Sequence, residues 1–197
     1  MKGWVLGGLC AVLGLLSPGA GAAEGPAWRI DRGDVKILVP LRPGGAFTAT
    51  TTSMNGTLSL AGEKPARLTG EVAVVLATID TGIALRNQHL REKYLEVGKG
   101  PGFDTAVVSD IRFREADGEA FQGSSGFTGA LTLHGVKHAV DGTADIRHQG
   151  NDRRVKAVFS LVMSEFGITA PMYLGVGVAD KLLVTVEFLA VRAQVAK

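Results

Sequence analysis

Four histidines and a set of isolated carboxylates are the side chains of this chain that could do acid–base or metal chemistry. His134 and His138 stand four residues apart, which is the spacing of zinc-binding pairs on helices. Gly135 falls between them, however, and no acidic pair or cysteine accompanies them. His89 and His148 have no evident companions either. Because a zinc site needs several converging ligands, we predict no metal site.

Motifs for covalent or nucleotide chemistry are missing as well. The "GSSG" stretch at 123–126 lacks the spacing of a nucleophile elbow, and no glycine-rich phosphate loop occurs. Single carboxylates such as Glu71 and Asp110 are typical of a solvated surface. We therefore predict neither a cofactor nor enzymatic activity. One alternative stays open, an enzyme in which His89 and His134 meet at the mouth of one cavity.

A hairpin corner explains His134 without chemistry. Apolar side chains recur at every second position over residues 126–133, and the run restarts at Val136. A two-residue turn at His134-Gly135 would pair Leu133 with Val136 on the same face of a sheet. Histidine is among the residues enriched at positive φ, and glycine adopts it freely. We predict that His134 and Gly135 form this turn.

The first 23 residues resemble a secretory signal. A positively charged start precedes an apolar run from Trp4 to Leu16, and small residues follow, with cleavage expected after Ala22 or Ala23. This predicts a periplasmic protein with one mature domain over 24–197. Cleavage would remove the only cysteine, Cys10, and one of the 21 Lys and Arg residues, leaving all 19 Asp and Glu residues. The mature chain would be nearly neutral, and its scattered cations exclude a nucleic-acid partner.

Most of the remaining chain alternates apolar and polar side chains with period two. The pattern is clearest over 35–41, 105–113, 155–163 and 182–190, and Asn55-Gly56 is typical of a two-residue hairpin turn. A content of 27 glycines also favours strands and tight turns. Several such strands predict an all-β fold, either an antiparallel sandwich or a barrel. From the period alone, the apolar faces fit a packed core and a ligand cavity equally well.

One segment has helical rather than strand periodicity. In "TGIALRNQHLREKYLEV", residues 81–97, the apolar Leu90, Tyr94 and Val97 fall on one side. This predicts one amphipathic helix of about four turns. A second short helix is expected near 164–172. The fold class is thus all-β with one or two short helices.

Four stretches carry a resemblance to a known family. "TGIALRNQHLREKYLEV", "FTGALTLHGVKHAV", "SEFGI" and "VADKLLVTVEFLAVRA" occur in the order seen in the YceI-like family. That family has an R-D-x-H-L-R helix, an L-T-L-H-G-V hairpin and a D-F-G-I turn, and the similarity covers about 28–193. Asn87 stands where the family usually has Asp, and Met163 where an Arg is common. These two changes would remove an ion pair at the cavity mouth.

The resemblance implies a fold and a function. It implies an extended antiparallel eight-stranded barrel, similar to lipocalins, around a long apolar cavity. The implied ligand is an isoprenoid or other long-chain lipid, held for transport, storage or sequestration in the periplasm. A barrel of this size can hold one elongated ligand. An interaction module for a membrane redox or stress partner is the second alternative, and a homodimer and a peripheral membrane contact both stay open.

The inward faces of the strands, capped by the apolar face of the helix, are the expected ligand-binding residues. They are Val72, Val74, Leu76, Leu90, Tyr94, Val107, Ile111, Phe113, Phe127, Leu131, Ala157, Phe159, Leu161, Val184, Val186 and Phe188. Arg86, His89 and Arg91 on the helix are expected to meet a polar headgroup.

Overall fold

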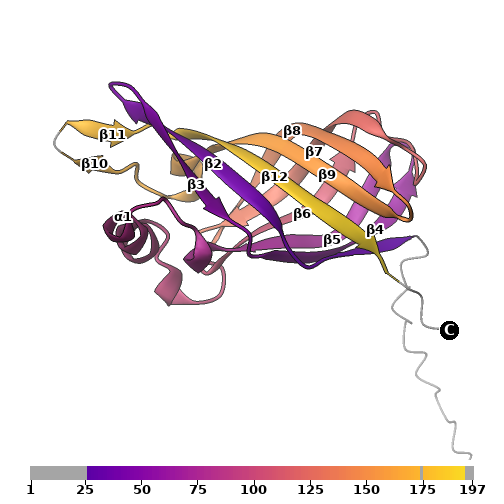
Figure 1. Cartoon of the computed structure of the whole chain (residues 1–197), viewed down its shortest axis with the longest axis horizontal. Coiled ribbons are helices and arrows are strands. Elements are labelled where there is room, and N and C mark those ends of the chain that lie inside the picture. Colours follow the sequence, from indigo (N-terminus) through magenta and orange to yellow (C-terminus); the bar gives the residue numbers. More distant parts are fainter. Residues whose placement is uncertain (1–25, 174, 194–197) are drawn as a thin grey trace, which may run out of the picture.

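The chain forms a closed antiparallel barrel that is longer than it is wide (Figure 1). The computed structural model describes residues 26–173 and 175–193. The predicted all-β, eight-stranded barrel is confirmed, with extra strands and one short α-helix. The strands are β1 (Ala27–Ile30), β2 (Gly33–Arg42), β3 (Ala46–Thr51), β4 (Met54–Glu63), β5 (Ala66–Val75), β6 (Thr105–Phe113), β7 (Gly123–Leu133), β8 (Val136–Gln149), β9 (Asp152–Val162), β10 (Met172–Tyr173), β11 (Val176–Val178) and β12 (Lys181–Arg192).

Each wall strand pairs with the next one along the chain, and β12 closes the barrel against β1 and β2. The barrel wall begins with two long strands that are each interrupted once. The first consists of β1 and β2, and the second consists of β3 and β4. β1 and β2 both pair with β12, while β3 pairs with β2 and β4 pairs with β1. The short β10–β11 hairpin extends the sheet beyond the end of β2. Such an up-and-down order leaves few free strand edges.

The Asn55-Gly56 hairpin prediction is wrong. The turn between the first two long strands lies at 43–45 instead, where the Leu41 amide donates to the Gly45 carbonyl over 2.9 Å. Asn55 and Gly56 lie inside β4. A Cβ at Gly56 would approach the Glu71 carbonyl oxygen to 2.3 Å. Position 56 therefore needs glycine because the neighbouring strand approaches too closely for a side chain, which is a known reason for glycine inside a strand.

A bulge in β6 changes which side chains face inward. Asp110 has φ of 54°, and the register between β6 and β7 shifts between Ser109 and Arg112. Ala106 and Val108 before the bulge line the barrel interior, and so does Ile111 after it. One extra residue thus reverses the alternation, as expected for a side-chain period of two.

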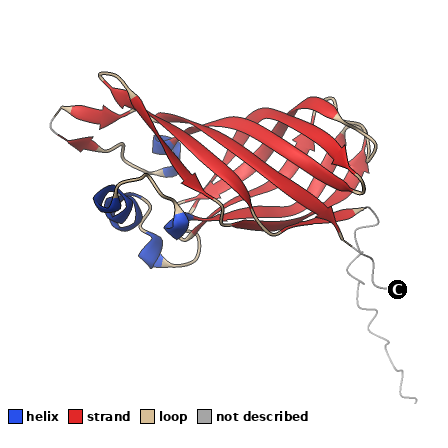
Figure 2. Cartoon of the chain, viewed as in Figure 1, coloured by secondary structure: helices blue, strands red, loops and turns tan. Residues whose placement is uncertain are grey.

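Helical segments gather at one end of the barrel (Figure 2). The expected helix over 81–97 is shorter: α1 (Ala84–His89) runs into a π-helical turn, η2 (Leu90–Tyr94), and a 3₁₀ turn, η3 (Val97–Lys99), follows. Two further 3₁₀ turns are η1 (Leu76–Thr78) and η4 (Met163–Phe166), the latter at the second predicted helix. Among the described residues, no helix has the length and apolar character to cross a membrane.

Candidate ligand-binding cavity

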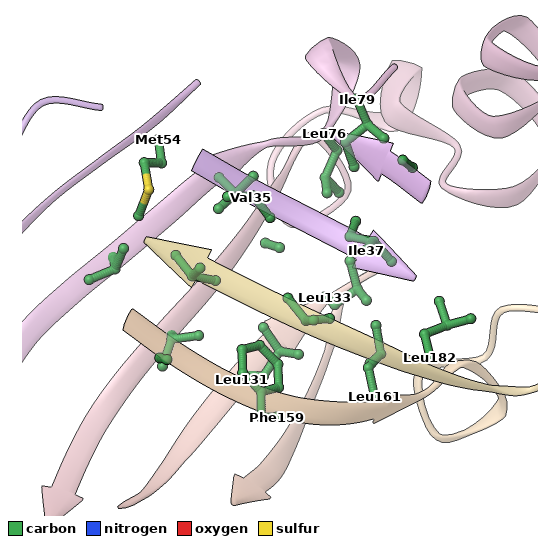
Figure 3. A pocket seen from close by; sticks show the side chains of 18 of the residues that line it. Val35, Ile37, Met54, Leu76, Ile79, Leu131, Leu133, Phe159, Leu161 and Leu182 are labelled. Carbon is green, nitrogen blue, oxygen red and sulfur yellow. The ribbon is translucent and has the colours of Figure 1, made fainter. Parts of the chain in front are cut away.

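The barrel interior is hollow. A cavity of about 1370 Å³ runs through it, lined by side chains from every wall strand. Figure 3 shows several of them, including Val35, Leu131 and Phe159, projecting from different strands toward the same space. Protein cores are close-packed and contain few voids larger than a water molecule. A void of this size, above the roughly 300–1,000 Å³ of common small-molecule pockets, therefore decides between the packed core and the cavity in favour of the cavity.

The period-two faces found in the sequence form most of the cavity wall. All the expected wall residues except Val107 line it: Val72, Val74, Leu76, Leu90, Tyr94, Ile111, Phe113, Phe127, Leu131, Ala157, Phe159, Leu161, Val184, Val186 and Phe188. The inward placement of Val107 is wrong. Val107 pairs with Ala73 and Thr132, neither of which lines the cavity, because the bulge at Asp110 reverses the alternation of β6.

The first two long strands contribute wall residues that we did not single out. Val35, Ile37 and Val39 of β2 line the cavity, together with Phe47 and Ala49 of β3. The alternation over 35–41 was visible in the sequence and could have identified the β2 residues. The β3 residues lie in a short threonine-rich run whose pattern is too brief to distinguish its two faces.

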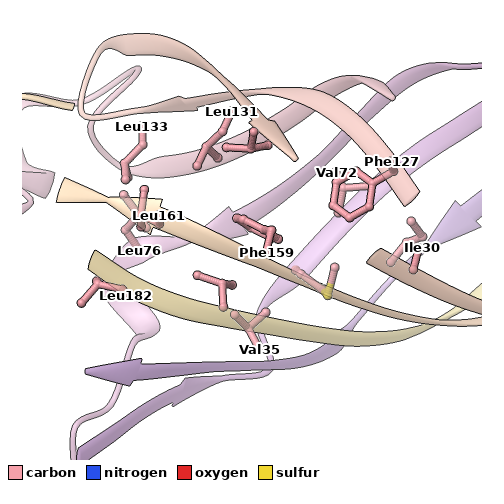
Figure 4. Close-up of a cluster of buried hydrophobic side chains, with 14 of the residues drawn as sticks. Ile30, Val35, Val72, Leu76, Phe127, Leu131, Leu133, Phe159, Leu161 and Leu182 are labelled. Atoms are coloured by element: carbon pink, nitrogen blue, oxygen red, sulfur yellow. The ribbon is translucent and has the colours of Figure 1, made fainter. Parts of the chain in front are cut away.

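Aromatic and small side chains shape the middle of the cavity. The rings of Phe127 and Phe159 meet edge to face with centroids 6.3 Å apart, and both point into the interior (Figure 4). Ala157 is paired with Ala144 on one side and Val186 on the other, so small side chains lie next to one another at mid-length. Small side chains at this level leave more of the interior unfilled than larger ones would.

One end of the cavity opens to solvent beside the helices. Ile83 and Leu85, at the start of α1, both line the cavity and are exposed. Met172 of β10 and Val176 of β11 do the same. Because these four side chains are in contact with both the cavity and bulk solvent, they mark its mouth. α1 and the β10–β11 hairpin lie at the same end of the barrel in Figure 1.

Asn87 holds α1 in place at this mouth. Its Oδ1 accepts hydrogen bonds from the Thr81 amide at 2.8 Å and the Thr81 hydroxyl at 2.7 Å, and its Nδ2 donates to Asp80 at 2.7 Å. The Asn87 amide and the Gly82 N–H hold the pKa of Asp80 below its usual 3.8. An ionised aspartate at position 87 could only accept hydrogen bonds, so this departure from the family pattern matches the carboxylate beside it.

Cationic side chains of the helical segment also line the mouth. The Arg86 guanidinium carbon lies 4.0 Å from the centroid of the Phe47 ring, a cation–π geometry. His89 and Lys93 line the cavity as well. Arg91 is not among the lining residues: its Nη2 donates to the carbonyl of Ile79 over 3.4 Å, so its contact with a headgroup stays a prediction. Val97, the last residue of the expected helix face, packs against the core without lining the cavity.

His134 forms the predicted turn and makes two further contacts. Its φ is 53° and that of Gly135 is 75°, and Leu133 pairs with Val136. The His134 Nδ1 donates to the Phe166 carbonyl over 3.0 Å, and its Nε2 lies 3.0 Å from Oε2 of Glu96. The ring does not line the cavity. His134 therefore ties the β7–β8 hairpin to the ends of two helical segments, and it does not meet His89 at the mouth.

The opposite end of the cavity is filled by a tryptophan and charged side chains. Trp28 is 6% exposed, and the guanidinium carbons of Arg153 and Arg192 lie 5.6 Å and 5.4 Å from its ring centroid. Glu119 forms ion pairs with both arginines. The Arg153 side chain is 11% exposed and also donates to backbone carbonyls at this end. These charged side chains pack against Trp28 at this end of the cavity, whereas exposed apolar side chains surround the mouth beside α1.

Ligand sets for metals do not form among the described residues. Over 26–173 and 175–193, no three His, Cys, Asp or Glu side chains come together in a way that could hold a metal ion. The lining of the cavity is mostly apolar, with cationic side chains at its mouth.

Fold and cavity together define a class of protein, lipocalin-like barrels with a large apolar cavity. The model of the YceI-like domain matches residues 28–190, and the chain belongs to the YceI-like family. No curated protein matches the chain.

Solved structures share the fold at low sequence identity. A polyisoprenoid binding domain from Saccharophagus degradans superposes with a TM-score of 0.65 at 15% identity, covering 84% of this chain and 98% of that one. BcnA of Burkholderia cenocepacia gives 0.60 at 14% identity, covering 79% and 96%. A YceI protein of Campylobacter jejuni gives 0.53 at 14% identity, covering 75% and 85%.

Proposed function

We propose that this chain is a periplasmic lipid-binding protein that holds an isoprenoid or similar long apolar chain in its cavity for transport, storage or sequestration. The observation that carries the proposal is the apolar cavity of about 1370 Å³, whose mouth beside α1 is lined by exposed apolar side chains. The structural likeness to a domain described as polyisoprenoid binding supports it. The signal-like residues 1–23, which lie outside the described residues, support secretion.

Burial of the chain would supply the affinity. Each CH₂ group moved from water into an apolar site contributes about 0.8 kcal/mol, less the cost of ordering a flexible chain. Affinity should therefore rise with each added isoprene unit and stop rising once the cavity is full. A cavity that needs no specific polar partner along its length fits a linear chain of repeating apolar units.

The headgroup would lie at the mouth. Arg86, His89 and Lys93 line that end, and Arg86 is held by its contact with Phe47. These side chains can donate to an oxygen-bearing or anionic group at the end of a lipid. We infer that the apolar tail points toward Trp28 and the polar end toward α1.

A binding protein is a better fit than an enzyme. The alternative needed His89 and His134 together at one mouth, but His89 lines the cavity while His134 is bonded to Phe166 and Glu96 outside it. Among the described residues, no carboxylate lines the mouth beside His89, since Glu119 is at the far end. We propose that the protein has no catalytic residues.

Two measurements test the proposal. Mass spectrometry of an organic extract, from protein purified from its own periplasm, should repeatedly detect a lipid with a long apolar chain. Titration of delipidated protein with polyprenols of increasing length should then give affinities that rise and level off. Extracts that are repeatedly empty, together with no binding of any added polyprenol, would contradict the proposal.

A further inference from the structure

The mouth of the cavity is surrounded by an exposed apolar surface. We define the mouth rim as Ile83, Leu85, Met172 and Val176, whose exposed fractions are 49%, 61%, 79% and 48%. Isolated apolar residues on a surface are ordinary, but a group of large ones around an opening is typical of an interaction site. Their exposure is not explained by ligand binding alone, because a chain inside the barrel would not cover side chains that face bulk solvent.

The rim is built from two separate segments. Ile83 and Leu85 come from the start of α1, and Met172 and Val176 come from the β10–β11 hairpin. Both segments project at the same end of the barrel (Figure 1). The rim thus brings four exposed apolar side chains from two separate segments to one end of an elongated molecule.

The ionisable side chains that line the cavity at this end are basic, whereas the carboxylates of the same end, Asp80, Glu92 and Glu96, lie outside the cavity lining. Arg86, His89 and Lys93 line the mouth, and Lys93 is exposed. Among the described residues that line the cavity, the only carboxylate is Glu119, which is paired with Arg153 and Arg192 at the far end. Apolar side chains next to Lys and Arg are the combination that binds the interface of anionic bilayers. An acidic surface is therefore favoured over a neutral or basic one.

We propose that the mouth rim docks onto an anionic lipid membrane, with its four apolar side chains inserted among the lipids and Lys93 and Arg86 at the phosphates. The polyprenyl chain then passes directly between the bilayer and the cavity without crossing water. This inference rests on the proposed function, because it gives the stored lipid its route of exchange. At the other end of the cavity, buried Trp28 lies against Arg153 and Arg192.

Vesicle flotation with the full mature chain tests the docking. Wild-type protein should float with vesicles of phosphatidylcholine containing 30–40% phosphatidylglycerol, bind pure phosphatidylcholine at least about tenfold less, and dissociate as salt is raised. Leu85→Asp and Met172→Asp, on the two separate segments, should each lower binding at least about tenfold. Val191→Asp is the matched control: Val191 is 38% exposed on β12, pairs with Arg29 of β1, and does not line the cavity.

Charge-reversal variants test the electrostatic contribution to vesicle binding. Lys93→Glu should weaken binding to the anionic vesicles, whereas Lys64→Glu, in the β4–β5 turn at the far end, should not. Wild-type protein that binds polyprenols but does not float with any vesicle would overturn the docking and leave the proposed function standing. Equal loss in Leu85→Asp and Val191→Asp would overturn it too, as would a rim-dependent dimer or protein complex without vesicle binding. Absence of polyprenol binding would instead remove the proposed function.

Discussion

Ala157 is the residue at which the hollow interior can be tested most directly. It lines the cavity at mid-length between Ala144 and Val186. In a packed core, Ala157→Trp would destabilise the fold by roughly 1–3 kcal/mol or more. In the cavity the ring has space, so we expect a thermal midpoint close to that of the delipidated parent. The ring would occupy part of the lipid path, and binding of long polyprenols should fall at least about tenfold.

The control for Ala157→Trp is the same change one residue further along. Val158 pairs with Thr143 and Thr185 and does not line the cavity, so Val158→Trp should leave polyprenol binding unchanged. Both variants must be compared without lipid, since bound lipid itself raises the midpoint. Shorter polyprenols should bind Ala157→Trp better than longer ones do. A midpoint far below that of the delipidated parent would contradict the cavity at this position.

His134 shows what a turn argument captures and what it leaves out. Its positive φ was predictable because His-Gly follows one alternating run and precedes another. Its contacts with Phe166 and Glu96 were not, because they join segments 32 and 38 residues away in the chain. Long-range hydrogen bonds to a backbone carbonyl leave no local pattern in a sequence.

A substitution separates the two roles of His134. Asparagine also accepts positive φ, but its side chain is too short to reach both partners. We expect His134→Asn to destabilise the protein by about 1–3 kcal/mol, since the Phe166 carbonyl loses its donor. His148 on β8 also donates to a carbonyl, that of Phe121, but at an exposed site where water can replace it, so His148→Asn should cost less than about 0.5 kcal/mol. Urea unfolding measures both; equal stability of the two variants would show that only the turn matters.

At the scale of elements, the bulge in β6 decides which side chains meet the ligand. Sequence alternation placed Val107, Ile111 and Phe113 on one face, but the extra residue at Asp110 puts Val108 there in place of Val107. A bulge of this kind needs no glycine or proline, and a single aspartate gives no warning of it. The same limit applies to Asn55-Gly56, a strong turn pattern that tertiary pairing overrides inside β4.

A pair of adjacent substitutions tests the position of the bulge. Val108→Asp places a carboxylate on the apolar cavity wall, whereas Val107→Asp places it on the outer face beside Thr132. Burying an unpaired charge against a lipid chain is strongly unfavourable. We therefore expect polyprenol binding to fall at least about a hundredfold for Val108→Asp and less than about threefold for Val107→Asp, measured by titration of delipidated protein. The reverse order would show that β6 keeps strict alternation.

The whole molecule was more predictable than its details. Alternation and turn residues indicated an antiparallel β fold, since period two over many short runs has few other solutions. They did not choose between a packed core and a cavity, because side chains alternate in the same way in both. That choice depends on whether opposite walls touch, a property of barrel diameter rather than of any single strand. The mouth rim was hidden for a related reason: it combines residues of 83–85 and 172–176 that only the fold brings to one end.

Carboxylates distributed over the whole barrel make its free energy of unfolding depend on pH in the acidic range. Asp80, Glu96, Glu115, Asp180 and Glu187 all have a pKa below their usual values of 3.8 for aspartate and 4.5 for glutamate. The main causes are hydrogen bonds. Glu115 accepts one from the Gly126 N–H, Asp180 accepts one from the Ser164 hydroxyl, and Glu96 accepts one from Lys99. The folded protein therefore stabilises the ionised form of each of these five carboxyl groups more than the unfolded chain does.

The sign of the pH dependence follows from these lowered pKa values. A carboxylate with a lowered pKa contributes its full stabilisation above its usual pKa, and that contribution is lost as the pH falls through the folded-state value. We therefore expect the free energy of unfolding in urea to be nearly constant from pH 6 to 5 as far as these groups decide it, and to fall steadily from about pH 4.5 to 3. Glu115→Gln should be less stable than wild type at pH 6, because Gly126 N–H and Ser125 lose a charged acceptor, and the gap should close toward pH 3. A stability that rises between pH 4.5 and 3, or a Glu115→Gln gap that widens there, would mean that these carboxylates favour folding in their protonated form.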